Sequence, residues 1–218
     1  HDWRNAGASK GVTVQATGTV KVVPDGVSFN FAVSVLAQSS ETAMSEASAS
    51  AESVRKVLED AGIAGEDIAT QNVSVYPEYV SSTTGTQTLS GYRAQQVFTV
   101  TLRETATAGE VVDAVIAAGG NSLQVYGVTP TLLDTEAAVA QAREAAIKSA
   151  KAKAKDYAEL IDADLGSVEY VNEIASPTSP IPLMAGDAAT AETSMAKTVI
   201  NLGTQEVSVS VEVRWSLN

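Results

Sequence analysis

The sequence contains no cysteine, and its single histidine stands at position 1. Without cysteine the chain has no disulfide, no thiolate nucleophile and no cysteine-ligated zinc site. Chain termini are seldom well ordered, so His1 does not supply the fixed imidazole that a general base, a nucleophilic serine or a metal site needs. We therefore expect no catalytic residue, no cofactor-binding residue, no metal ligand and no cofactor, and we predict that the chain is not an enzyme.

Paired carboxylates remain a possible source of acid–base chemistry. Asp156, Glu159, Asp162 and Asp164 lie near the end of a predicted helix, and Asp162-x-Asp164-x-Gly166 has the spacing of part of a calcium loop. The further oxygen ligands and the terminal glutamate of such a loop are missing, so we interpret the cluster as a solvated acidic turn. A carboxylate-dependent hydrolase would need two inward-facing acids with raised pKa values and is the least favoured function.

Basic residues are scarce: 14 Lys and Arg face 26 Asp and Glu, which gives a net charge of -12. The summed field repels phosphate backbones and anionic headgroups, so we expect no nucleic-acid partner. No apolar run approaches the roughly 18 to 20 residues of a membrane-spanning helix, so we predict no transmembrane segment in this chain. Only 5% of the residues are aromatic, which disfavours a deep aromatic pocket of the kind that a small-molecule or peptide binding module uses.

Apolar residues are plentiful, at 44% against 18% charged, and this composition is typical of a chain that folds. Chains of 218 residues often form one domain. We predict a disordered segment over residues 1–10 and a single domain over residues 11–218.

Alternating apolar residues predict two strands over residues 12–23 and 27–36, separated by Pro24-Asp25-Gly26. We expect these strands to pair as a hairpin whose apolar face carries Phe29 and Phe31. A helix over residues 43–61, with small and apolar residues at steps of three and four, is predicted to cover that face.

The later segments continue this pattern. Strands over residues 70–79 and 92–102 predict a second hairpin, and a short helix follows from Thr107 to Gly119. The rest of the chain is predicted to contain a strand over residues 123–132 and an alanine-rich helix over 134–161. Two further strands are predicted over 168–174 and 207–217. The predicted order is ββαββαβαββ, an α+β fold of largely antiparallel sheets with helices packed on one face.

Two groups of residues are candidates for an interface. Aromatic residues with arginine are enriched at interfaces, although a hairpin can equally place tyrosines on its packed face. The long loop predicted over residues 176–202 has few charges and several apolar residues, which must fold back or meet a neighbour. The candidate interface residues are Tyr76, Tyr79, Tyr92, Arg93, Ile181, Leu183 and Met184.

Several motifs then carry a family resemblance. The run Gly18-Thr19-Val20-Lys21-Val22-Val23-Pro24-Asp25 resembles the G-x-V-x-V-x-P-D opening of the SIMPL-domain family, which includes periplasmic immunogenic and stress-associated proteins. Matches follow in the family's order at residues 70–79, at 91–94, at Gly119-Gly120-Asn121, in the alanine-rich helix and at 203–207. Leu202 departs from the family pattern, in which proline commonly precedes the glycine.

The resemblance implies an α+β domain, export to the cell envelope, a ring-like or channel-like homo-oligomer in some relatives, and no established reaction. We therefore expect a periplasmic, cell-surface or secreted protein whose signal peptide has been removed, and a membrane tether upstream of the chain is compatible with this. The predicted function is a noncatalytic envelope protein that self-associates, with a stress-related or scaffolding role. The alternative is a small-molecule or peptide binding module of the envelope.

Overall fold

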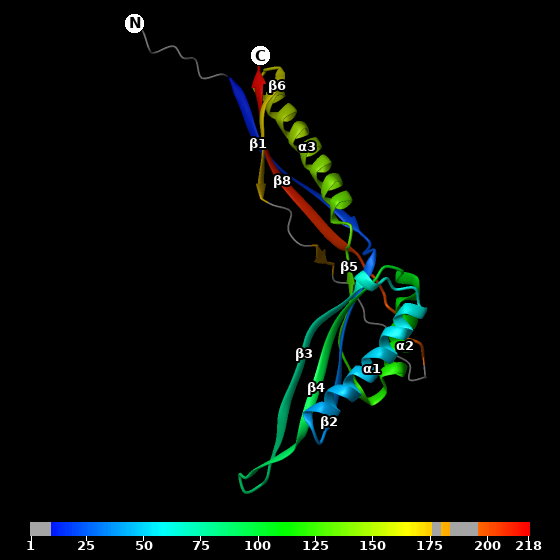
Figure 1. Ribbon diagram of the computed structural model, residues 1–218. Coiled ribbons are helices and arrows are strands. Elements are labelled where there is room, and N and C mark those ends of the chain that lie inside the picture. The colour runs from blue at the N-terminus through cyan, green and yellow to red at the C-terminus, as the bar shows by residue number, and fades with distance from the viewer. Residues whose placement is uncertain (1–9, 176–179, 184–195) are drawn as a thin grey trace. The chain divides into compact units, whose positions relative to one another are not determined.

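A computed structural model describes residues 10–175, 180–183 and 196–218 (Figure 1). The chain divides into two compact units. The terminal unit comprises His1–Val23, Asp134–Gly186 and Gly203–Asn218, and the central unit comprises Pro24–Leu133 and Asp187–Leu202. Each unit pairs an antiparallel sheet with helices, which confirms the predicted α+β fold. The disordered segment over residues 1–10 and the single domain over residues 11–218 stay predictions, and residues 1–9 lie outside the described chain.

In the terminal unit, helix α3 (Thr135–Leu160) covers one face of an antiparallel sheet. The strands are β1 (Gly11–Val22), β8 (Gln205–Leu217) and β6 (Leu165–Ala175), in the order β1-β8-β6, and the short β7 (Ile181–Pro182) also pairs with β8. Figure 1 shows α3 running along this sheet.

Small residues bring α3 unusually close to the sheet. Every fourth residue of α3 from Ala138 to Ala158 is a buried alanine, and the helix contacts both β1 and β8. A Cβ atom on Gly18 of β1 would lie 2.0 Å from the carbonyl oxygen of Ala142, so only glycine permits this contact between strand and helix backbones.

In the central unit the described strands form a sheet in the order β3-β4-β2-β5. Their bounds are β2 (Gly26–Ala37), β3 (Ile68–Ser81), β4 (Gln87–Leu102) and β5 (Leu123–Thr131). The helices are α1 (Ser40–Asp60) and α2 (Ala108–Gly119), with short 3-10 turns at Gly65–Asp67, Thr105–Thr107 and Gly120–Ser122. Helix α1 packs on β2 and β4 and against α2.

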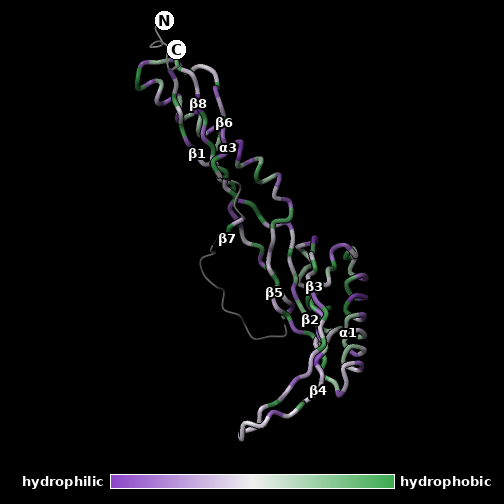
Figure 2. The backbone as a smooth tube through the Cα atoms, turned by 60° about the vertical axis from the view of Figure 1, so that its left-hand side comes forward, coloured by the Kyte–Doolittle hydropathy of each residue, from purple (hydrophilic) through white to green (hydrophobic). Residues whose placement is uncertain are grey.

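The core of the central unit confirms the predicted register of β2. Phe29 and Phe31 are fully buried, and their rings lie 4.7 Å apart, while the Phe31 and Phe98 rings lie 5.3 Å apart. The buried residues of α1 recur at steps of four and three, as an amphipathic helix requires, and are Ala43, Ala47, Ala51, Val54 and Leu58. Figure 2 shows hydrophobic and hydrophilic residues alternating along α1.

The predicted hairpin between the first two strands is wrong. β1 pairs with β8, whereas β2 pairs with β4 and β5, and the Pro24-Asp25-Gly26 turn joins the two units instead of two paired strands. Alternation identifies the apolar face of a strand but not its partner, because every half-buried strand shares the same period. β8 pairs with β1 along its whole length, from Gly11 opposite Ser216 to Val22 opposite Gln205.

The described part of the predicted loop, residues 196–202, packs against the central unit. The Thr198 N–H donates to Asp113 Oδ2 over 2.9 Å, and the Thr198 hydroxyl donates to Asp113 Oδ1 over 2.5 Å. These hydrogen bonds hold the pKa of Asp113 below its ordinary value. Ile200 and Leu202 pack against the core. This strap, residues 196–202, is thus held to α2 by the Asp113 carboxylate and to the core by two apolar side chains.

Candidate functional site

The second hairpin extends beyond the sheet that supports it. β3 and β4 pair from Ile68 opposite Val100 to Ser81 opposite Gln87, but β2 accompanies β4 only as far as Tyr92. Residues 78–91 therefore form a two-stranded hairpin arm (Figure 1). An isolated two-stranded hairpin is marginally stable in water at best.

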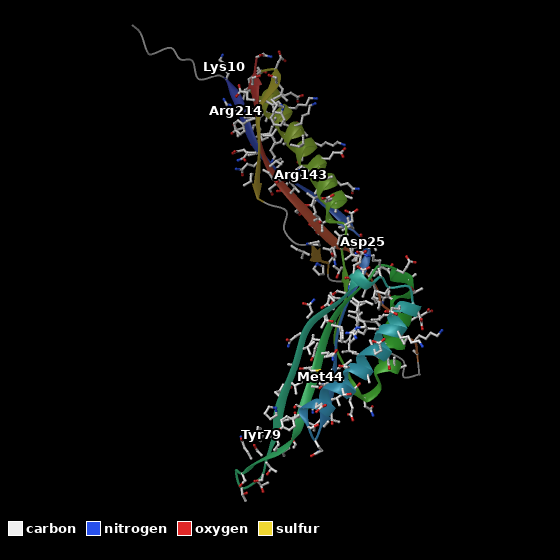
Figure 3. All side chains as sticks on the ribbon, in the orientation of Figure 1. Lys10, Asp25, Met44, Tyr79, Arg143 and Arg214 are labelled. Atoms are coloured by element: carbon white, nitrogen blue, oxygen red, sulfur yellow. The ribbon has the colours of Figure 1, made fainter. Side chains whose placement is uncertain are left out.

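The hairpin arm exposes apolar side chains and is uncharged beyond its base. Tyr79 is 55% exposed, Val80 58% and Leu89 45%, and Tyr79 lies opposite Leu89 in the strand pairing. Residues 79–90 contain no Asp, Glu, Lys or Arg. Figure 3 shows the Tyr79 side chain on the arm, and the pale tip in Figure 2 reflects its serines, threonines and glycine. The arm is therefore an uncharged surface on which Tyr79, Val80 and Leu89 are the exposed apolar side chains.

An ion pair fixes the base of the arm. Arg93 of β4 donates to Glu78 Oε2 of β3 through Nε at 3.0 Å and Nη2 at 2.8 Å, and its Nη1 donates to the Ser34 hydroxyl of β2 at 3.0 Å. The hydrogen bond with Glu78 raises the pKa of Arg93. One guanidinium thus joins three neighbouring strands where the arm leaves the sheet.

Gly91 permits the arm to leave the sheet. Its φ of +153° is one that side-chain-bearing residues rarely adopt, and a Cβ atom there would lie 2.6 Å from the carbonyl oxygen of Ala37. Gly91 therefore allows the backbone conformation at the base of the arm, and Arg93 links the strands there.

The candidate interface residues differ in exposure and in the part of the fold to which they belong. Tyr76 and Tyr79 are exposed, at 41% and 55%. Tyr92 packs against the core, which is the alternative interpretation of a hairpin tyrosine, and Arg93 serves the base of the arm.

The remaining candidates belong to the terminal unit. Ile181 is 60% exposed in β7, opposite Glu206 of β8. Leu183 is half-buried, and its N–H donates to the carbonyl of Thr204 over 3.0 Å. Met184 lies outside the described residues.

Val80, Leu89 and Gly91 were not among the predicted site residues. The exposure of Val80 and Leu89 follows from strand length, which the sequence does not reveal: Leu89 lies in β4, which is longer than β2, so among the described strands part of β4 has no partner on the β2 side. The Gly91-Tyr92 step marked the start of the predicted strand over residues 92–102, but the strand begins earlier, at Gln87.

A metal site and a membrane span each place requirements on the described residues. Among residues 10–175, 180–183 and 196–218, no group of three or more His, Asp and Glu side chains is arranged to hold a metal ion. Within the same residues no helix is both long and apolar enough to cross a membrane. Hydrogen bonds are the largest cause of the shifted pKa values of Arg93, Arg103 and Asp113.

Comparison with known proteins identifies the family. Residues 12–215 match the family described as SIMPL, protein of unknown function (DUF541). The 26 kDa periplasmic immunogenic protein of Brucella melitensis is 26% identical over 93% of this chain and 82% of its own length. The protein YggE of Escherichia coli K12 is 30% identical over 79% of this chain and 69% of its own length, and that of Edwardsiella ictaluri is 29% identical over 78% and 71%.

The Brucella relatives are named as periplasmic proteins, which confirms the location predicted for this chain. The match spans nearly all of the sequence and includes both compact units. The chain belongs to the SIMPL family of periplasmic proteins, whose molecular function is unknown.

Proposed function

We propose that this chain is a noncatalytic envelope protein that associates with itself through its hairpin arm into a closed, ring-like or channel-like assembly. Its role in this proposal is that of a scaffold, and no reaction is assigned to it. The observation that carries the proposal is the arm, in which Tyr79, Val80 and Leu89 are exposed on a two-stranded extension that lacks charged side chains over residues 79–90.

Charge favours contact through this arm. Each copy carries a net charge of -12, so copies repel one another wherever acidic surfaces meet. An uncharged segment is the part of the surface where this repulsion is smallest and where apolar burial stabilises the contact most. Identical chains that associate through one patch usually form closed symmetric oligomers, which is why a ring is proposed.

Light scattering on matched variants tests this proposal. Tyr79→Ser, Val80→Ser and Leu89→Ser together remove the apolar surface of the arm, and the core stays intact because these side chains are exposed. The control combines Leu160→Ser, Tyr170→Ser and Val171→Ser, which change the same three residue types at exposed positions of the terminal unit. We expect the arm variant to have the monomer mass of 22.5 kDa and the control to keep the mass of the unmodified assembly. Equal masses for both variants would contradict a role for the arm.

A further inference from the structure

Within the part of the chain that the structure describes, one edge of the sheet in the terminal unit has no neighbouring strand. Among the described residues β1 pairs with β8 alone, without any register shift from Gly11 to Val22. An edge strand presents a row of backbone N–H and C=O groups that can pair with another extended chain. β1 is therefore a potential template for an added strand.

The hydrogen bonds show which groups face this open edge. The Leu217 N–H donates to the Lys10 carbonyl over 2.9 Å, so these two residues form a hydrogen-bonded pair. Such pairs alternate along an antiparallel ladder, and the unbroken register places Gln15, opposite Glu212, at a position that is not hydrogen-bonded to β8. The N–H and C=O groups of Thr13, Gln15 and Thr17 therefore point away from β8.

A lysine of α3 already donates a hydrogen bond to one of these backbone carbonyls. Lys153 Nζ donates to the Gln15 carbonyl over 2.6 Å. Tyr157, one helical turn further along α3, is 51% exposed beside it. These residues line a groove of about 360 Å³ between the strand edge and the helix, whose lining residues are Val12, Thr13, Val14, Gln15, Lys153 and Tyr157.

The opposite edge of the same sheet, formed by β6, differs from β1 in the regularity of its pairing and in its acidic residues. β6 contains three register irregularities against β8, and such bulges protect an edge from pairing. Its acids are also engaged: Glu169 pairs with Arg214 at 2.6 Å, and Glu173 pairs with Arg143 at 3.1 Å. β1 carries neither protection, since it has no bulge and no acidic residue.

We infer that this groove binds an extended peptide segment that carries a carboxylate, which adds to β1 as a further strand. A peptide N–H replaces the lysine as donor to the Gln15 carbonyl, and the released Lys153 ammonium binds the peptide carboxylate. Thr13 and Thr17 supply the neighbouring backbone groups.

Charge complementarity favours an acidic peptide over a second copy of this chain. The β1 strand of a second copy has no acidic residue, and the carboxylates at its β6 edge are already paired with arginines. Neither edge strand of a second copy would therefore bring a free carboxylate to the Lys153 ammonium. The groove belongs to the terminal unit and uses no residue of the hairpin arm, so its test is independent of the proposed self-association.

Fluorescence anisotropy with a labelled test peptide examines this inference. The probe is a short peptide of alternating valine and threonine with a central glutamate and serine ends, titrated with the full chain. One control peptide has glutamine in place of the glutamate. In another, the backbone amides that would pair with β1 are N-methylated. The protein variants are Lys153→Gln and, on the opposite flank of α3, Lys151→Gln as the matched control.

We expect saturable binding of the glutamate peptide and no binding of the N-methylated one. The glutamine peptide and Lys153→Gln should each weaken binding by about two- to fivefold, the range of an exposed ion pair, and together they should weaken it no further. Lys151→Gln should bind as the unmodified chain does.

Three results would overturn the inference: no binding of the glutamate peptide at millimolar concentration, equal binding of the N-methylated peptide, or an unchanged affinity in Lys153→Gln. Hydrogen exchange supplies the remaining test. If protection of the Thr13 and Gln15 amides rises with protein concentration in the absence of peptide, a second copy occupies the edge and the acidic-peptide assignment fails.

Discussion

Arg93 and Glu78 form an ion pair, with Nη2 and Oε2 2.8 Å apart, at the point where the hairpin arm leaves the sheet. Both side chains are partly shielded from water, with 24% and 36% of their surfaces exposed. Removing one partner leaves the other half-buried and unpaired, so Glu78→Gln should lower the free energy of unfolding by about 1 kcal/mol. Chemical denaturation measures this loss, and Glu52→Gln, on an exposed face of α1, is the control that should change little.

The same substitution should loosen the arm before it affects the rest of the unit. Hydrogen exchange should accelerate at residues of the arm in Glu78→Gln, while the amides of β2 keep their protection. Uniform acceleration across the central unit would show that the pair stabilises the whole sheet rather than the base of the arm.

Gly18 should tolerate no side chain. In Gly18→Ala the new Cβ atom would meet backbone atoms of Ala142 and Ala146, at 2.0 and 2.3 Å, which cannot move without displacing α3. We expect a loss of about 1 to 3 kcal/mol in the free energy of unfolding, as for other overpacked contacts. Gly127→Ala is the matched control, because a Cβ atom on this strand glycine has nothing within 4 Å. Equal stability of the two variants would contradict the close packing of α3 on β1.

The strap over residues 196–202 should detach in acid. The pKa of Asp113 is held below its ordinary value of 3.8 because the side chain and backbone of Thr198 donate hydrogen bonds to the carboxylate. A lowered pKa in the folded state means that the stabilisation is complete above 3.8 and is lost as the pH falls through the folded value.

Exchange of the Thr198 amide measured against pH should therefore rise below about pH 4. Asp113→Asn should remove this pH dependence, whereas Asp156→Asn on α3 should retain it. A Thr198 amide whose opening free energy is independent of pH in the unmodified chain would show that Asp113 does not hold the strap.

Local periodicity predicted the elements well. The order ββαββαβαββ is recovered, with a short β7 in addition, because alternation in strands such as β8 and steps of three and four in α1 are properties of neighbouring residues. The inward positions of Phe29 and Phe31 follow from the same alternation.

Strand partners were less accessible from the sequence. Thr17 and Ser210, whose hydroxyls lie 2.8 Å apart, are separated by 193 residues, and nothing in either local pattern specifies the other. The nearer apolar strand, β2, had an equally suitable period, and a turn-forming sequence stood between it and β1. Predicting β8 as the partner of β1 requires knowing how α3 packs on the sheet. That packing depends on Gly18 of β1 lying directly against the buried alanines of α3.

The site was predicted in part. Tyr76 and Tyr79 are exposed as an interface requires, but Tyr92 packs inward because it alternates with Arg93 on β4. Val80 and Leu89 were missed because their exposure results from the end of β2 at Ala37, a difference in strand length that no local pattern contains.

The mass of the unmodified chain in solution tests the central claim most directly. Light scattering at micromolar concentrations should give a defined multiple of 22.5 kDa that persists on dilution until the arm contacts dissociate. A single species of 22.5 kDa throughout this range would contradict self-association and would leave the hairpin arm without the partner proposed for it.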